Sequence, residues 1–219
     1  MRAKYVAQKI EELLDPEGSV WASGEKQTLA LMGTPLAMQP TAYVRNMYAG
    51  KEGEIGATKQ VTVTALHNGK YLAFHLNWAD PKEDSKIEDN DQFCDAAAIF
   101  LPTKAKAPLV TMGAPGLPVN MWYWRADQAA GRHVVAEGIG TTRTLDEKQV
   151  LTGRKWKDGQ WHVVIARALG IVSTEHVVQL RPSRSTPFGI AVWEGSHQER
   201  AGIKAVTLEY LELKLDPLA

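Results

Sequence analysis

Two strand–turn–strand patterns constrain the fold of this chain more than any other feature. In the first, residues 58–65 alternate valine with threonine, Asn68-Gly69 follows, and residues 71–78 resume an apolar run. In the second, Asp158-Gly159 lies between two strand-like stretches within residues 153–167. Asn-Gly and Asp-Gly are strong hairpin signals because a type I′ turn needs positive φ at both central positions. Both segments are therefore predicted to be antiparallel hairpins.

The rest of the chain is also rich in short strand-like segments separated by turn signals. They cover residues 93–101, 121–124, 188–193 and 206–215. In the last segment the alternation changes phase near Tyr210, which predicts a β-bulge. Short strands without an internal repeat predict an all-β fold, an antiparallel β-sandwich.

One helix is predicted, and it lies at the N-terminus. Between Arg2 and Leu14, Val6 and Ile10 share one helical face, and the turn signals that begin at Asp15 end the periodicity. The chain of 219 residues is long enough for one sizeable core. We therefore expect a single domain over residues 1–219.

Composition excludes several classes of protein. The 25 basic and 25 acidic residues give a formal net charge of zero, which argues against an extended basic surface for nucleic acid. One cysteine, Cys94, permits neither an internal disulfide nor a cysteine-based zinc site, and we expect it to be a small buried residue. No apolar run has the length of a membrane span, and no signal-peptide pattern follows Met1.

Catalytic motifs are missing from the sequence. There is no Gly-x-Ser-x-Gly elbow, no phosphate-binding Gly-Lys-Ser/Thr loop and no His-Glu-x-x-His. His75 and His162 lie in predicted strands and are expected to be structural. The acidic loop at residues 80–91 lacks the spacing of a calcium loop and is expected to be solvated. The six histidines, which show no metal-ligand spacing, are His67, His75, His133, His162, His176 and His197.

Two residues are candidates for binding a cofactor. Met112 lies in an irregular segment, 108–118, whose three prolines and two glycines predict a rigid loop that a planar group can approach closely. The alternative interpretation of Met112 is a core residue, because methionine ordinarily fills gaps in a core. Lys204 precedes the final strand-like segment, and its sequence context predicts a lysine at the surface.

Four groups of residues, taken together, resemble a known family. They are Pro35–Arg45, Asp91–Pro102, Met112-Gly113 with Pro118–Trp124, and Ala191–Ser196 with Glu199-Arg200 and Lys204–Val206. In this order they are similar to the haem b-binding gamma subunits of the ethylbenzene dehydrogenase and dimethylsulfide dehydrogenase group of molybdenum enzymes. Relatives occur in selenate reductase, chlorate reductase, steroid C25 dehydrogenase and some nitrite oxidoreductases. The alanines at 96–98 are smaller than the residues expected there.

The resemblance implies a β-sandwich in which loops at the sheet hold one non-covalent haem b. A methionine and a lysine ligate the iron in that family, and the matching positions are Met112 and Lys204. Deprotonating an ordinary lysine at pH 7 costs roughly 4–5 kcal/mol, and burial can lower the pKa of a lysine by ~3–5 units, so such a ligand is feasible. With both axial positions filled, the haem transfers electrons and performs no bond-making chemistry. No propionate-binding residue is assigned by the resemblance.

The role implied is that of a non-catalytic gamma subunit in a periplasmic complex of three subunits. Its partners would be a molybdopterin alpha subunit, an iron–sulfur beta subunit and a soluble cytochrome c-type carrier. Three alternatives stay open: a haem-free β-sandwich that binds carbohydrate or protein, a structural subunit with Met112 in a core and Lys204 in solvent, and a haem protein with His197 in place of Lys204. In the first alternative, sugar rings would stack on Trp122, Trp124, Trp156 or Trp161.

Overall fold

Strands dominate the computed structural model, which describes residues 1–145, 149–173, 175 and 177–218. The strands are β1 (Arg2–Tyr5), β2 (Lys26–Ala30), β3 (Met32–Gly33), β4 (Gln60–His67), β5 (Tyr71–Ala79), β6 (Ala96–Pro102), β7 (Val119–Arg125), β8 (Arg132–Ala136), β9 (Arg143–Thr144), β10 (Val150–Lys157), β11 (Gln160–Ala168), β12 (Ser185–Trp193), β13 (Ala205–Val206) and β14 (Leu211–Leu215). The helices are α1 (Ile10–Leu13), α2 (Ala42–Tyr48) and the 3₁₀ segments η1 (Ser19–Ser23), η2 (Leu36–Met38), η3 (Glu52–Glu54) and η5 (Gly195–His197).

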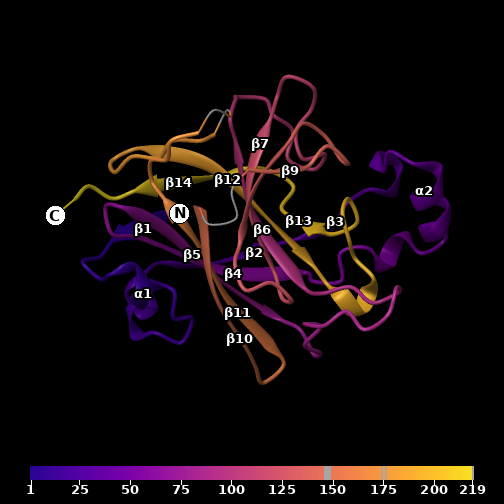
Figure 1. Ribbon diagram of the computed structural model, residues 1–219, viewed down its shortest axis with the longest axis horizontal. Helices are drawn as coiled ribbons and strands as arrows, with labels where there is room; N and C mark the ends of the chain where they lie inside the picture. Colours follow the sequence, from indigo (N-terminus) through magenta and orange to yellow (C-terminus); the bar gives the residue numbers. More distant parts are fainter. Residues whose placement is uncertain (146–148, 174, 176, 219) are drawn as a thin grey trace.

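The strands pair in one continuous order that folds back on itself as a sandwich (Figure 1). The main order is β10-β11-β5-β4-β1-β14-β12-β6-β7-β8-β9. β12 belongs to both layers: Ser185 to Phe188 pair with β14, and Gly189 to Trp193 pair with β6. The predicted all-β sandwich is thereby confirmed, and a single strand connects its two layers.

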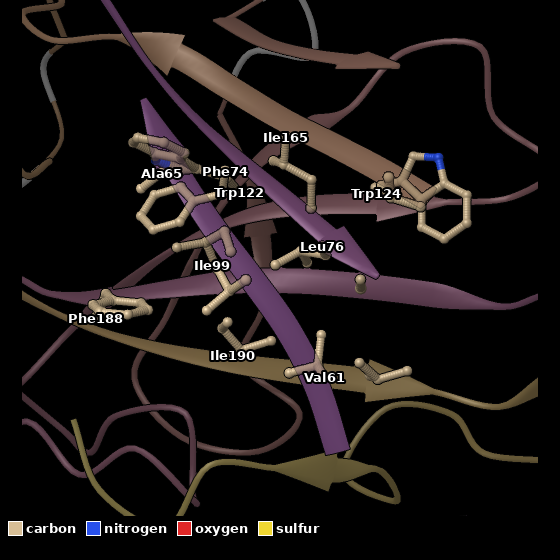
Figure 2. Close-up of a cluster of buried hydrophobic side chains, with 14 of the residues drawn as sticks. Val61, Ala65, Phe74, Leu76, Ile99, Trp122, Trp124, Ile165, Phe188 and Ile190 are labelled. Carbon is tan, nitrogen blue, oxygen red and sulfur yellow. The ribbon is translucent and has the colours of Figure 1, made fainter. Parts of the chain in front are cut away.

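The core lies between the layers and follows the two-residue period of the strands. Val61, Phe74 and Ile165 project from one layer toward Ile99 and Trp122 of the other, as Figure 2 shows. All five side chains are fully buried. The two-residue period of each strand therefore determines which side chains meet at the centre of the molecule.

Both predicted hairpins are present. β4 pairs with β5, and Gly69 between them has φ +83°. The side-chain oxygen of Asn68 accepts hydrogen bonds from the backbone N–H groups of Lys70 and Tyr71. β10 pairs with β11 through a two-residue turn in which Asp158 and Gly159 both have positive φ. Only the second turn has the type I′ dihedral signs, because Asn68 keeps a negative φ.

The N-terminal prediction is half wrong. α1 occupies Ile10–Leu13, but Arg2–Tyr5 forms β1 and pairs in parallel with both β4 and β14. Ala3 lies opposite Ala65 and Leu215 and is fully buried. Pairing with two strands satisfies backbone groups that two open edges would otherwise expose, and this outweighs a weak helical pattern. The sheet is consequently mixed rather than purely antiparallel.

Two further details differ from the expectations. The phase change near Tyr210 is not a bulge: β13 pairs with β12 and β3 in one layer, and β14 pairs with β12 and β1 in the other. The helix α2 was not anticipated, although Thr41 caps it by accepting a hydrogen bond from the Val44 backbone N–H. Within the described ranges, no helix combines the length and the apolar character needed to cross a bilayer.

Candidate functional site

The strands β6, β7 and β12 are buried on both faces. On β7, Trp122 and Trp124 point into the core, whereas Met121 and Tyr123 lie on the outward face. A second apolar cluster covers that outward face, and much of it comes from the loop between β6 and β7 that contains Met112. The layer is thus covered by a sheet on one side and by loops on the other.

A pocket of about 250 Å³ opens on the outward face. Its apolar part comprises Met112, Met121, Val134 and Trp193. Predominantly apolar walls with a few polar groups are typical of small-molecule and cofactor sites. The other lining residues are Tyr123, Arg125, Arg132, Gly140, Thr142, Thr144 and Ala201.

Met112 is held in a strained loop conformation. Its φ of +59° lies in the left-handed region, which is uncommon for a bulky residue, and the side chain is only 3% exposed. The Met112 N–H donates to the Leu109 carbonyl, and its own carbonyl accepts from the Gly138 N–H. Residues held in such conformations concentrate at functional sites. The predicted irregular loop therefore exists, and it presents Met112 to the pocket.

Lys204 is not a surface lysine. Its side chain is fully buried, and among the described residues its Nζ has neither a hydrogen-bond nor an ion-pair partner. Burial lowers the pKa of Lys204 to about 8, although the carboxylate of Glu199 acts in the opposite direction. The Lys204 backbone carbonyl accepts hydrogen bonds from the N–H and the hydroxyl of Thr34. An amine buried without a partner is costly, so it suggests a missing ligand.

Both candidate ligands, Met112 and Lys204, lie near Trp193. It lines the pocket together with Met112, and the Nζ of Lys204 lies 5.8 Å from the centroid of its ring. Lys204 itself does not line the pocket. Ala201 does, and its φ of +51° adds a second strained position. His197, the alternative ligand, lies on η5 with its side chain exposed.

The segment that leads to Lys204 is fixed by a buried carboxylate. Glu199 accepts hydrogen bonds from the backbone N–H groups of Gly56 and Ala57 through one oxygen, and from that of Glu194 through the other. These contacts join the loop before β4 to the end of β12. Glu199 therefore ties down the backbone that leads to Lys204 without a hydrogen bond to Nζ.

The donor atoms fit a haem iron. The thioether of Met112 and an unprotonated amine of Lys204 are both neutral ligands, and methionine is a familiar axial ligand of haem. Apolar walls formed by Met121, Val134 and Trp193 suit the macrocycle. The Lys204 Nζ, buried without a hydrogen bond from the described residues, is the specific observation in favour of such a group.

A buried group of carboxylates was not anticipated. Single oxygens of Asp80, Asp95 and Glu194 lie within 4.8 Å of one another, and all three residues are buried. Asp95 accepts from the indole of Trp161 and from two backbone N–H groups, including that of Gly195. Burial raises the pKa of Asp80 to about 8 and that of Asp95 to about 7. No local pattern marks these three residues, because the fold brings together distant segments, and none of them lines the pocket.

The remaining sequence candidates occupy structural positions. His75 and His162 stack with ring centroids 5.9 Å apart on β5 and β11, outside the pocket. Cys94 is buried as expected, and burial raises the pKa of its thiol to about 11. Glu88 is exposed in the acidic loop, as predicted, but Asp80 at the start of that loop is fully buried, contrary to the expectation of a solvated loop. His176 lies outside the described residues.

The tryptophans proposed for sugar stacking are not exposed platforms. Trp122, Trp124 and Trp161 belong to the core and are at most 1% exposed. Trp156 is partly buried, and its indole donates a hydrogen bond to the Asp80 carbonyl. The carbohydrate-stacking alternative is therefore contradicted for Trp122, Trp124 and Trp161, because these side chains pack against the molecule's own strands.

Comparison with protein families gives one match over most of the chain. Residues 18–153 and 138–205 match the family model described as ethylbenzene dehydrogenase. Both Met112 and Lys204 lie within the matched residues.

Three curated relatives are similar to the chain. The chlorate reductase subunit gamma of Ideonella dechloratans is 36% identical over 72% of this chain and 66% of the relative. A putative respiratory nitrate reductase heme subunit of Haloferax mediterranei is 37% identical over 68% of this chain and 53% of the relative. The dimethylsulfide dehydrogenase subunit gamma of Rhodovulum sulfidophilum is 28% identical over 93% of this chain and 76% of the relative. The chain thus spans only about half to three quarters of the length of these relatives.

Solved structures with a similar fold include carbohydrate-binding proteins. A family 9 carbohydrate-binding module of Caldicellulosiruptor kristjanssonii in complex with glucose has a TM-score of 0.55 at 12% identity, over 100% of this chain and 96% of the other. A putative carbohydrate-binding protein of Bacteroides uniformis has a TM-score of 0.53 at 9% identity, over 99% of this chain and 98% of the other. At these identities the similarity concerns the β-sandwich fold.

Proposed function

The chain belongs to the ethylbenzene dehydrogenase family, and on that premise we propose that it is a non-catalytic electron-transfer subunit with one haem b. Residues 1–219 form a single haem-binding domain, and Met112 and Lys204 are the two axial ligands. The haem is held non-covalently, since the sequence contains no Cys-x-x-Cys-His attachment motif.

The observation that carries the proposal is the buried amine of Lys204. It lies beside Trp193, a wall of the pocket that also contains Met112. A lysine that bound nothing would be expected to reach solvent or a carboxylate, yet among the described residues Nζ has no such partner. Ligation would give this nitrogen the partner that it lacks.

The two residues have complementary tasks. Haem b supplies a one-electron iron couple when it is bound. Met112 provides a neutral thioether, which tends to raise the potential of that couple. Lys204 must be unprotonated, and with its pKa at about 8 the deprotonation at pH 7 costs about 1–2 kcal/mol instead of roughly 4–5 for an ordinary lysine. Two protein ligands leave no coordination position for a substrate.

The partners follow from the relatives rather than from the fold. Two relatives are gamma subunits, one of a chlorate reductase and one of a dimethylsulfide dehydrogenase. By analogy, this chain would join a molybdopterin alpha subunit and an iron–sulfur beta subunit. It would exchange electrons between the beta subunit and a soluble cytochrome c-type carrier in the periplasm.

The first test is spectroscopic. The purified full chain, with haemin added if necessary, is measured oxidised and dithionite-reduced, and the haem type is assigned by pyridine haemochrome. We expect a low-spin, six-coordinate b-type spectrum. Met112→Ala and Lys204→Ala should each abolish the six-coordinate low-spin form, because each removes one axial ligand.

Matched controls separate ligation from general damage. Met38→Ala changes an exposed methionine, and Lys214→Ala changes an exposed lysine on β14; both should keep the wild-type spectrum, as should His197→Ala. If His197→Ala instead removes the low-spin signal, Lys204 is not the ligand. A wild-type protein that neither contains haem nor takes up haemin would refute the electron-transfer function.

A further inference from the structure

The pocket changes from apolar to basic along the strands that form its floor. Met121 lies opposite Val134, and the next outward-facing pair is Tyr123 opposite Arg132. Arg125 follows, two residues further along β7 and on the same face. Because the register of β7 and β8 sets this order, one end of the pocket is hydrophobic and the other carries guanidinium groups.

A hydrogen-bond network holds the two arginines in position. Arg125 donates from Nε and Nη2 to the two carboxylate oxygens of Asp127, at 2.5 and 2.9 Å. Gln128 donates to Asp127 and accepts from Nη2 of Arg132, so the side chains form one continuous chain. A guanidinium fixed in this way is preorganised for an anion, because little side-chain entropy remains to be lost.

Arg125 keeps donor capacity toward the pocket, which Arg132 also lines. A guanidinium has five N–H donors, and the bonds to Asp127 use one edge of the Arg125 group. Its Nη1 donates to no residue that the structure describes. The Arg125 side chain is 31% exposed, which places it at the rim. The hydroxyl residues Thr142 and Thr144 also line the pocket. The basic end therefore faces solvent and offers charged and neutral donors.

We propose that Arg125 and Arg132 bind the two carboxylates of the haem and so set the orientation of the macrocycle in the pocket. This inference rests on the proposed function, and it adds the recognition of the ligand's anionic edge. Haem b is a largely apolar plane with both carboxylates on one side, and the pocket has the same distribution of apolar and charged groups. Charge-assisted hydrogen bonds from arginine to carboxylate are among the stronger polar contacts in proteins.

The test compares haemin with its dimethyl ester, which keeps the macrocycle and lacks the negative charges. Affinity is measured by spectral titration of the full chain, and the dissociation rate by transfer to excess apomyoglobin. Wild type should prefer haemin over the ester by about tenfold or more. Arg132→Gln and Arg125→Gln should each reduce that preference severalfold, and the double variant should abolish it, while the low-spin spectrum is kept.

Three control variants separate the loss of carboxylate binding from other effects of a substitution. Arg132→Lys should keep part of the preference because it keeps the charge. Asp127→Asn loosens the Arg125 contact without removing a guanidinium and should keep most of it. Arg184→Gln changes an exposed arginine away from the pocket and should have no effect.

The outcomes distinguish the two proposals. If haemin and its ester bind wild type equally, or the arginine variants keep the full preference, the carboxylate assignment is overturned and the Met112–Lys204 ligation stands. If wild type binds neither compound, or Met112→Ala leaves the spectrum unchanged, the proposed function fails, and the carboxylate assignment fails with it.

Discussion

The two faces of the layer formed by β6, β7 and β12 are built in contrasting ways. The inner face carries tryptophan and branched aliphatic residues that pack against the other layer. The outer face carries alanine, methionine and arginine beneath loops, and the buried amine of Lys204 lies on this side. Adjacent residues of the same strands therefore pack in the core on one face and, in the proposed function, line the haem site on the other. The difference indicates that the outer face keeps groups that an ordinary core would exclude.

The largest effect is expected on the inner face. Trp122→Ala should reduce the free energy of unfolding by about 3–5 kcal/mol, because it removes a fully buried indole that contacts Phe74 and lies 4.8 Å from the Arg167 guanidinium. Urea unfolding measures this change. Trp156→Ala, at a partly buried position, should cost clearly less. Equal losses for the two variants would mean that the inner face is not the main core.

The outer face should respond in the opposite sense. Lys204→Met keeps the length of the side chain and removes a buried amine without a hydrogen bond, so the haem-free protein should become more stable by about 1–3 kcal/mol. The same variant should lose the lysine-ligated spectrum. Urea unfolding of the haem-free protein measures the first effect and haemin titration the second. A destabilised Lys204→Met would show that the amine has a structural role, and the contrast between the faces would then fail.

A smaller effect on the free energy of unfolding is expected at the border between the faces, where Asp95 precedes β6. This effect depends on pH. The pKa values of Asp80 and Asp95, about 8 and about 7, exceed the unfolded value of roughly 3.9. The folded state then binds more protons between about pH 4 and pH 8. These residues' contribution to stability is therefore complete below about pH 4 and is lost as the pH rises to 8. The neighbouring groups are Glu194, Asp84 and Lys82.

Asp80→Asn tests this dependence. The variant removes one of the crowded carboxylates, so it should be more stable than wild type at pH 8 by about 1–2 kcal/mol and should lose less stability between pH 5 and pH 8. Urea unfolding at both pH values measures the difference. Glu83→Gln, on an exposed neighbour, is the matched control. An unchanged pH profile in Asp80→Asn would assign the proton uptake to another group.

Local sequence determined the parts of the fold that depend on neighbouring residues. Asn68-Gly69 and Asp158-Gly159 marked both hairpins, and the valine–threonine alternation in residues 58–65 marked β4, whose Val61 and Val63 lie in the core. The prolines and glycines around Met112 predicted its irregular loop. In each case the physical cause acts over a few residues: a required positive φ, a missing N–H donor, or a two-residue period.

Tertiary structure decided the features that depend on distant segments. Arg2–Tyr5 became a strand because β4 and β14 both offered it backbone partners. The composition around Lys204 indicates a surface lysine, and it is buried because β13 is enclosed between β12 and β3. Arg125 and Arg132 share a pocket because of the register of β7 and β8. Burial and the proximity of charges depend on contacts between segments far apart in the chain, so no local sequence pattern predicts them.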